Sequence, residues 1–317
     1  MKNWKRQIVA TAAAVLLGLG LVGCGAAKSE STAASSAESS AKESGSESTA
    51  AASAAESKTD ADTALRVGAL KGPTAMGLVN LMQDSQDGKS EGKYEFSIAS
   101  QPDEVAAKLV SGELDIALLP ATMASALYNK TEGKIAVVNI NTLGVLYCVS
   151  GDTNIHGVQD LAGKTVYTTG QGATPEYVLR YLLKENGVTD CNLEFKSEPT
   201  EIASLLAADA TAIAVLPQPF VTVAEAKNEQ LKTAFSLTDA WDSLNNGSRL
   251  VTGVTVVRKD VLESRPAEVA NFVTEQERSA ATAVEDVDQT AARVVAFGIL
   301  ENEGIAKKAL PACNITA

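Results

Sequence analysis

The chain has 317 residues, enough for two domains of ordinary size, and 45% of them are hydrophobic, which suits a protein with a substantial core. Its formal net charge is −12 and no cluster of Lys and Arg occurs after residue 6, so we exclude nucleic acid as a partner. Four cysteines without a C-x-x-C pair and a single histidine offer no zinc ligand set, and we expect no metal and no cofactor.

A basic and then apolar N-terminus predicts an export signal. Lys2, Lys5 and Arg6 precede an apolar run at 8–21. That run is shorter than the roughly 20 residues that a membrane-spanning helix needs. We therefore favour a signal peptide over a retained membrane helix.

The end of the apolar run resembles the bacterial lipobox. It reads Leu21-Val22-Gly23-Cys24, with a leucine three places before the cysteine and small residues directly before it. The resemblance implies a signal peptide at 1–23 and a lipid-modified (palmitate-carrying) Cys24. Cys24 would then attach the protein to the membrane through its lipid.

Residues 24–62 are almost entirely Ser, Ala, Glu and Lys. They lack the apolar side chains needed to offset the conformational entropy lost on folding, so we expect a disordered tether. A flexible tether of this length has a root-mean-square span of roughly 35 Å. We therefore place the folded body at the outer face of the cytoplasmic membrane.

From residue 65 onward, short β-rich runs alternate with helical patterns, which predicts an α/β fold with largely parallel sheets. The predicted strands are 65–70, 93–99, 115–119, 135–140, 143–150, 164–168, 192–196, 212–216, 231–236 and 250–258. The predicted helices are 75–85, 102–111, 121–129, 174–186, 200–208, 218–229, 266–283, 285–299 and 302–310.

The alternation starts twice, which predicts two lobes. The run 143–150 has no helix before it, and 250–258 is followed only by helices, which need a sheet to pack on. We predict that lobe 1 comprises 63–146 and 255–317 and that lobe 2 comprises 147–254. The two crossover strands would form a hinge.

Three motifs resemble one known family. Residues 155–166 match the I-x-x-x-x-D-L-x-G-K-x-V signature that opens the second lobe of periplasmic-type solute-binding proteins. Residues 111–117 (SGELDIA) resemble the family's helix-to-strand turn, and 256–269 resemble its return strand and the helix that follows. The best match, over about residues 64–310, is the nitrate/sulfonate/taurine/thiamine-precursor-like branch of ABC-importer binding proteins. The chain ends soon after a predicted helix, where relatives often carry one more.

Within these motifs the residues are predicted to serve the scaffold. Gly112 would end a helix in the left-handed conformation, and Asp115 would open the next strand. Asp160, Gly163 and Lys164 are likewise read as structural residues.

The resemblance implies a type II periplasmic-binding-protein fold, an α/β architecture of two lobes joined by two crossover strands. It further implies a monomer that closes its hinge on a small-molecule solute. The closed form would deliver the solute to the transmembrane subunits of an ABC permease with a cytoplasmic ATPase.

In open α/β sheets, ligands bind beyond the carboxyl ends of the strands, so the loops there hold the candidate site. Thr74 and Thr174 are each predicted as the N-cap of a helix that faces the cleft. Helix starts favour anions, so we expect a small polar solute and consider an anion in particular. Tyr147 would either form a cleft wall or pack within the hinge. The candidate residues are Thr74, Ala75, Met76, Gln101, Thr122, Thr169, Gly170, Gln171, Gly172, Ala173, Thr174 and Gln218.

Two alternatives stay open. The resemblance also extends to cytosolic enzymes of menaquinone and thiamine-precursor biosynthesis, but we expect no catalytic residue here, and His156 is read as a surface turn residue. The other alternative is a ligand-sensing lipoprotein that serves no transporter.

Of the cysteines, Cys148 is expected to be buried. Cys191 and Cys313 could pair outside the cell, and their spacing does not decide it.

Overall fold

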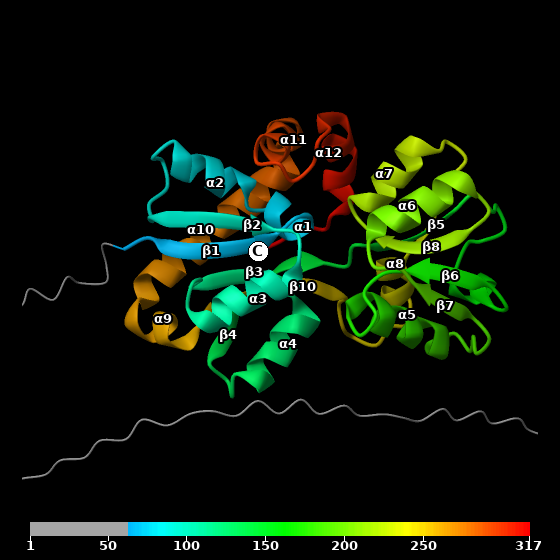
Figure 1. Ribbon diagram of the computed structural model, residues 1–317, viewed down its shortest axis with the longest axis horizontal. Coiled ribbons are helices and arrows are strands. Elements are labelled where there is room, and N and C mark those ends of the chain that lie inside the picture. The colour runs from blue at the N-terminus through cyan, green and yellow to red at the C-terminus, as the bar shows by residue number, and fades with distance from the viewer. Residues whose placement is uncertain (1–62) are drawn as a thin grey trace, which may run out of the picture. The chain divides into compact units, whose positions relative to one another are not determined.

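The computed structural model describes residues 63–317, which build two five-stranded sheets flanked by helices (Figure 1). The first sheet, in lobe 1, has the strand order β2-β1-β3-β10-β4, and the second, in lobe 2, has the order β7-β6-β8-β5-β9. This confirms the predicted two-lobed α/β fold class. The predicted signal peptide, lipidated Cys24 and tether lie outside the described residues.

All ten predicted strands are present. Lobe 1 holds β1 (Leu65–Leu70), β2 (Tyr94–Ala99), β3 (Ile116–Pro120), β4 (Ile135–Leu143), β10 (Val251–Arg258), α1 (Pro73–Met76), α2 (Val79–Gln86), α3 (Pro102–Ser111), α4 (Ala121–Lys130), α9 (Lys259–Ser264), α10 (Pro266–Glu285), α11 (Val287–Ala296) and α12 (Glu303–Ala309). Lobe 2 holds β5 (Leu146–Ser150), β6 (Thr165–Thr168), β7 (Asn192–Phe195), β8 (Ile213–Pro217), β9 (Lys232–Ser236), α5 (Thr174–Glu185), α6 (Pro199–Ala208), α7 (Phe220–Lys227) and α8 (Leu237–Asp242). Single 3₁₀ turns lie at Val158–Leu161 and Leu310–Ala312.

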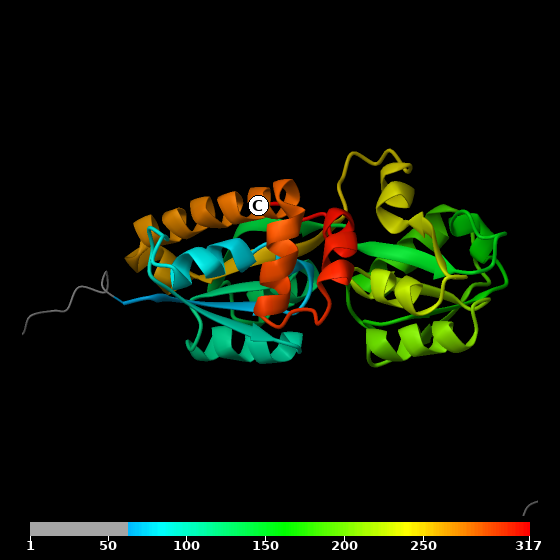
Figure 2. The ribbon, with the colours of Figure 1, turned by 90° about the horizontal axis from the view of Figure 1, so that it is seen from above.

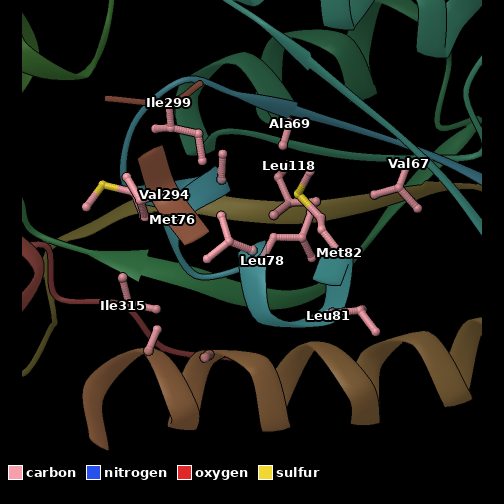
Figure 3. Packing of buried hydrophobic residues seen from close by; sticks show 14 of the residues in the cluster. Val67, Ala69, Met76, Leu78, Leu81, Met82, Leu118, Val294, Ile299 and Ile315 are labelled. Carbon is pink, nitrogen blue, oxygen red and sulfur yellow. The ribbon is translucent and has the colours of Figure 1, made fainter. Parts of the chain in front are cut away.

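Alternating residues of each strand bury against helices on opposite faces of the sheet. In β3, Ile116 and Leu118 join the core under α1, α2, α10 and α11, whereas Ala117 and Leu119 join the core under α3 and α4. Figure 3 shows Leu118 beside Met82 in the first of these cores. Lobe 2 repeats the plan, with α5 and α8 on one face and α6 and α7 on the other. Both lobes are therefore three-layered.

The sheets are mixed rather than largely parallel. β1 pairs in parallel with β2 and β3, but β10 runs antiparallel to both β3 and β4. In lobe 2, β6 pairs in parallel with β7 and β8, whereas β5 is antiparallel to β8 and β9. β5 and β10 each arrive from the other lobe and enter where the parallel strands end, so they must run the opposite way.

The helix predicted at 75–85 is broken into α1 and α2 by a side chain from α10. The Ser279 hydroxyl donates to the Gly77 carbonyl at 2.8 Å and accepts from the Leu81 backbone N–H at 3.0 Å. These two backbone groups would otherwise bond each other as residues i and i+4 of one helix. An inserted hydroxyl is a recognised cause of a helix break. Local sequence cannot predict this break, because its cause lies about 200 residues away.

Asp115 plays a different part from the one predicted. Gly112 does end α3 with φ 85°, but β3 begins one residue after Asp115. The Asp115 carboxylate accepts three hydrogen bonds from Arg66 of β1, from its backbone N–H (2.9 Å), its Nε (3.0 Å) and its Nη2 (2.5 Å). Asp115 is only 3% exposed, so it ties the starts of two neighbouring strands together.

The first crossover, between β4 and β5, is held by the C-terminal segment. The Leu143 N–H donates to the Asn314 carbonyl at 3.0 Å, and the Asn314 side-chain amide donates to the Gly144 carbonyl. The second crossover joins at the same point, since the Thr252 hydroxyl donates to the Leu143 carbonyl. A Cβ on Gly144 would lie 2.1 Å from the Thr238 hydroxyl of α8 and 2.9 Å from the Leu250 side chain next to β10, so the first crossover packs tightly against both.

The cysteines of residues 63–317 are all free, so Cys191 and Cys313 do not pair. Cys313 is buried in a core of lobe 1, while Cys191 packs against a core of lobe 2. Cys148 is fully buried as predicted, and burial raises the pKa of its thiol to about 12.

We expect Asp115→Asn to lower the free energy of unfolding by about 1.5–3 kcal/mol, since hydrogen bonds to a buried charged group are lost. Urea unfolding followed by circular dichroism measures this. Glu104→Gln is the matched control, because Glu104 forms an exposed ion pair with Lys108, and such pairs contribute about 0–1 kcal/mol. Equal losses in the two variants would contradict a special role for Asp115.

Candidate functional site

A cavity of about 200 Å³ opens where the carboxyl ends of β1, β3 and β8 meet the start of α5 and the two crossovers. This is the place where open α/β sheets bind ligands. Larger hollows on the described surface, such as one of about 700 Å³ between α3 and α4, are lined from one lobe alone. The cavity residues are Leu70, Lys71, Pro73, Thr74, Pro120, Thr142, Val145, Leu146, Ala173, Thr174, Pro175, Pro217, Thr252 and Gly253.

Four prolines give the cavity much of its apolar wall. Pro120 and Pro217 end strands β3 and β8, and Pro73 and Pro175 lie in the first turns of α1 and α5. Proline is favoured at a helix start because its φ is already helical and its missing N–H would have no partner there. A local preference for strand-to-helix turns thus places four residues without an N–H donor around one cavity.

The threonine hydroxyls in the lining mostly donate to the protein itself. Thr74 donates to the Leu70 carbonyl at 3.2 Å, and Thr142 donates to the Asn141 side-chain oxygen at 2.9 Å. Thr252 donates to the Leu143 carbonyl, as described above. A hydroxyl has one hydrogen and two lone pairs, so these three can still accept a hydrogen bond but not donate one.

Two side-chain contacts join the lobes beside the cavity. The hydroxyls of Thr122 in α4 and Thr174 in α5 are 3.1 Å apart and share one hydrogen bond. The Gln101 side chain, at the start of α3, donates to the Glu198 carboxylate at the start of α6 at 3.2 Å. The first contact is partly buried and the second is exposed.

One cation and one nearby anion set the electrostatics. Lys71 is the only charged residue in the lining, and it is exposed. Glu176, in the first turn of α5, accepts from the Gly172 N–H and from Arg180 Nε, both at 2.7 Å. These bonds, the backbone one foremost, lower the pKa of the Glu176 carboxyl, so it is ionised at neutral pH. The start of α5 therefore already holds a carboxylate, whose charge Arg180 partly offsets.

Three of the predicted site residues line the cavity, namely Thr74, Ala173 and Thr174. Thr122 is hydrogen-bonded to Thr174, which lines the cavity, and Gln101 forms the exposed contact between the lobes with Glu198. The remaining predicted residues are not in the lining.

Ala75 and Met76 have fully buried side chains in a core of lobe 1, where Figure 3 shows Met76. Gln218 is 5% exposed, and its side-chain oxygen accepts from the Thr222 hydroxyl at 3.0 Å. Thr169, Gly170, Gln171 and Gly172 form the loop before α5; both glycines have φ near +70°, at 74° and 73°.

The predicted caps are wrong in detail. α1 begins at Pro73 after Gly72, and α5 begins at Thr174 after Ala173, and neither helix has a side-chain cap. Thr74 and Thr174 instead use their hydroxyls for the contacts given above. At α5 the Glu176 carboxylate bonds the loop N–H of Gly172, which leaves Thr174 free to reach Thr122.

Sequence reasoning missed the cavity residues contributed by the crossovers, Thr142, Val145, Leu146, Thr252 and Gly253. It singled out Tyr147, which lies outside the lining and whose hydroxyl donates to the Ala312 carbonyl at 2.8 Å. Burial raises the pKa of Tyr147 to about 12. Tyr147 thus packs within the hinge, the second of its two predicted roles. These residues could have been predicted from geometry, because segments that cross between two lobes line the cleft between them.

Residues 63–317 hold no cluster of His, Cys, Asp or Glu arranged to bind a metal ion. None of the helices described is both long and apolar enough to span a bilayer. His156 is exposed, as expected for a surface turn.

Solved structures share this fold. An ABC transporter protein from Parabacteroides distasonis matches with a TM-score of 0.68 at 25% identity, over 80% of this chain and 86% of that one. The periplasmic aliphatic sulphonate binding protein SsuA of Escherichia coli gives 0.64 at 16% identity, over 80% of each chain. The periplasmic nitrate-binding protein NrtA of Synechocystis gives 0.52 at 13%, over 74% of this chain and 66% of that one. The expected periplasmic-binding-protein fold is confirmed.

A comparison with curated proteins finds no match. A family model described as "Menaquinone biosynthesis" matches residues 65–309, from β1 through α12. Because this model covers nearly all of both lobes, the chain belongs to the menaquinone biosynthesis family, on the fold that ABC-importer binding proteins share.

Proposed function

We propose that this protein is an extracytoplasmic solute-binding lipoprotein. It captures a small solute in the cavity between its lobes by hinge closure and delivers it to an ABC import permease. The observation that carries the proposal is a cavity lined from both lobes and from both crossovers. The Thr122–Thr174 contact beside it is the kind of bond that forms only when the lobes meet.

The family description favours a second candidate, an enzyme of the same fold. A catalyst of that kind needs a group that can transfer a proton or attack the substrate. Among the described residues that line the cavity there is no Asp, Glu, His or Cys, and Lys71 is the one titratable side chain. This lining supports binding over catalysis.

A sensor lipoprotein without a transporter would have the same cavity. Genes for a permease and an ATPase next to the gene for this chain would favour import, and their absence would favour sensing. The binding step is common to both.

Lipid attachment at Cys24 predicts where the protein is found in the cell. We expect the unaltered chain in the membrane fraction with incorporated labelled palmitate, and Cys24→Ser in the soluble fraction without label, because acyl chains supply the membrane affinity. Cys191→Ser is the control and should behave like the unaltered chain. A Cys24→Ser protein that stays with the membrane would overturn the anchor.

Filling the cavity should abolish solute binding. We expect a compound at 100 times its dissociation constant to stabilise the protein by about 2.7 kcal/mol. Ala173→Trp should remove this effect, since Ala173 lines the cavity. The measurement is a thermal-shift screen over small sulfonates, carboxylates, pyrimidines and uncharged compounds. Ala107→Trp, on the exposed surface of α3, is the control and should keep the shift. Equal shifts in all three proteins would place binding elsewhere.

The Thr122–Thr174 hydrogen bond should stabilise the closed form. Thr122→Val and Thr174→Val should each weaken binding of the best compound by about 1 kcal/mol, or roughly fivefold, because each removes the same bond. The double variant should then be no weaker than either single one. Isothermal titration calorimetry measures this cycle, and additive losses would show that the two hydroxyls act independently.

A further inference from the structure

The size and wall of the cavity limit what can enter it. An apolar cavity of about 150 Å³ is large enough to hold benzene, so one of about 200 Å³ admits a single ring or a short branched chain with a small substituent. Its walls include four prolines, Val145, and Leu146. A charged group pressed against these walls without partners would lose part of its hydration at a cost.

The hydroxyls of the lining act mainly as acceptors, and Lys71 is its one charged donor. The hydroxyls of Thr74, Thr142 and Thr252 donate their hydrogens to oxygen atoms of the protein, and the four prolines have no N–H. Of the two hydroxyl hydrogens of Thr122 and Thr174, one forms the bond between them and the other can be donated to another group. An oxyanion needs several donors around each oxygen, whereas these hydroxyl lone pairs suit a ligand that brings its own N–H or O–H.

The charges near the cavity give an anion little support. The Lys71 ammonium is exposed, so water already solvates it. The Glu176 carboxylate lies in the first turn of α5, the place that favours an anion, and bonds the Gly172 N–H of the preceding loop and Arg180. An anionic solute at this helix start would have to compete with that carboxylate.

The geometry points to an uncharged, largely apolar organic solute that donates a hydrogen bond to the cavity hydroxyls. The inference rests on the proposed function and names the ligand class of that same site. It replaces the polar or anionic solute expected from the sequence, because the helix starts on which that expectation was based present prolines and a carboxylate.

Matched probes test the ligand class. Three apolar groups (benzyl, cyclohexylmethyl and n-pentyl) are each offered to the full chain as the alcohol, the methyl ether and the sulfonate, and dissociation constants are measured by calorimetry. We expect at least one alcohol to bind ten or more times tighter than its ether, which lacks the donor, and than its sulfonate. Ala173→Trp should abolish that binding, and Ala107→Trp should not.

Each contrary result has a distinct meaning. A sulfonate that binds tighter than its alcohol, and loses affinity in both Ala173→Trp and Lys71→Gln, overturns the ligand class but leaves the proposed function standing. If an ether binds as tightly as its alcohol, the hydrogen bond donated by the solute is overturned. If no alcohol binds while another compound of the wider screen does, the inference fails alone. If nothing binds in either experiment, both fail.

Discussion

The backbone at Leu143 and Gly144 holds together the two crossovers and the C-terminal segment. The first crossover passes through it, the second bonds to it through Thr252, and the C-terminal segment pairs with it through Asn314. Thr142, directly before it, and Val145, directly after it, line the cavity. The same short stretch therefore connects the lobes, bonds the C-terminal segment and is flanked by two residues of the cavity lining. Figure 2 shows α12 next to lobe 2, where it packs against α7, so the C-terminal region touches both lobes.

The apolar character of the cavity follows from the way strands turn into helices. Pro120 and Pro217 end the central strands β3 and β8, and Pro73 and Pro175 lie in the first turns of α1 and α5, where proline is favoured. These four prolines line one cavity and bring no N–H of their own to it. Solute preference in this fold can thus change through turn residues, without any change in the sheets.

Much of the fold could be predicted because strands and helices leave periodic patterns in the sequence. The ten strands and the two lobes follow from those patterns and from the motif at 155–166. Strand direction was harder, since antiparallel entry of β5 and β10 depends on where the chain comes from. The break between α1 and α2 was beyond reach, because it depends on one hydroxyl from α10.

The candidate site was harder to predict, for a physical reason. Loop position alone picks out Thr74, Ala173 and Thr174, which line the cavity. Ala75 and Met76 turn their side chains into the core, because a helix start has one face toward the cleft and another toward the core, and residue order alone does not separate the two faces. The direction in which each threonine hydroxyl donates is a tertiary property, which residue order does not give.

Gly144 sets how closely the first crossover can pack. A Cβ at this position would lie 2.1 Å from the Thr238 hydroxyl of α8 and 2.9 Å from the Leu250 side chain, next to the start of β10. A larger residue at position 144 would push the first crossover away from both neighbours. The spacing between the segments that join the lobes is therefore set by the one residue type without a side chain.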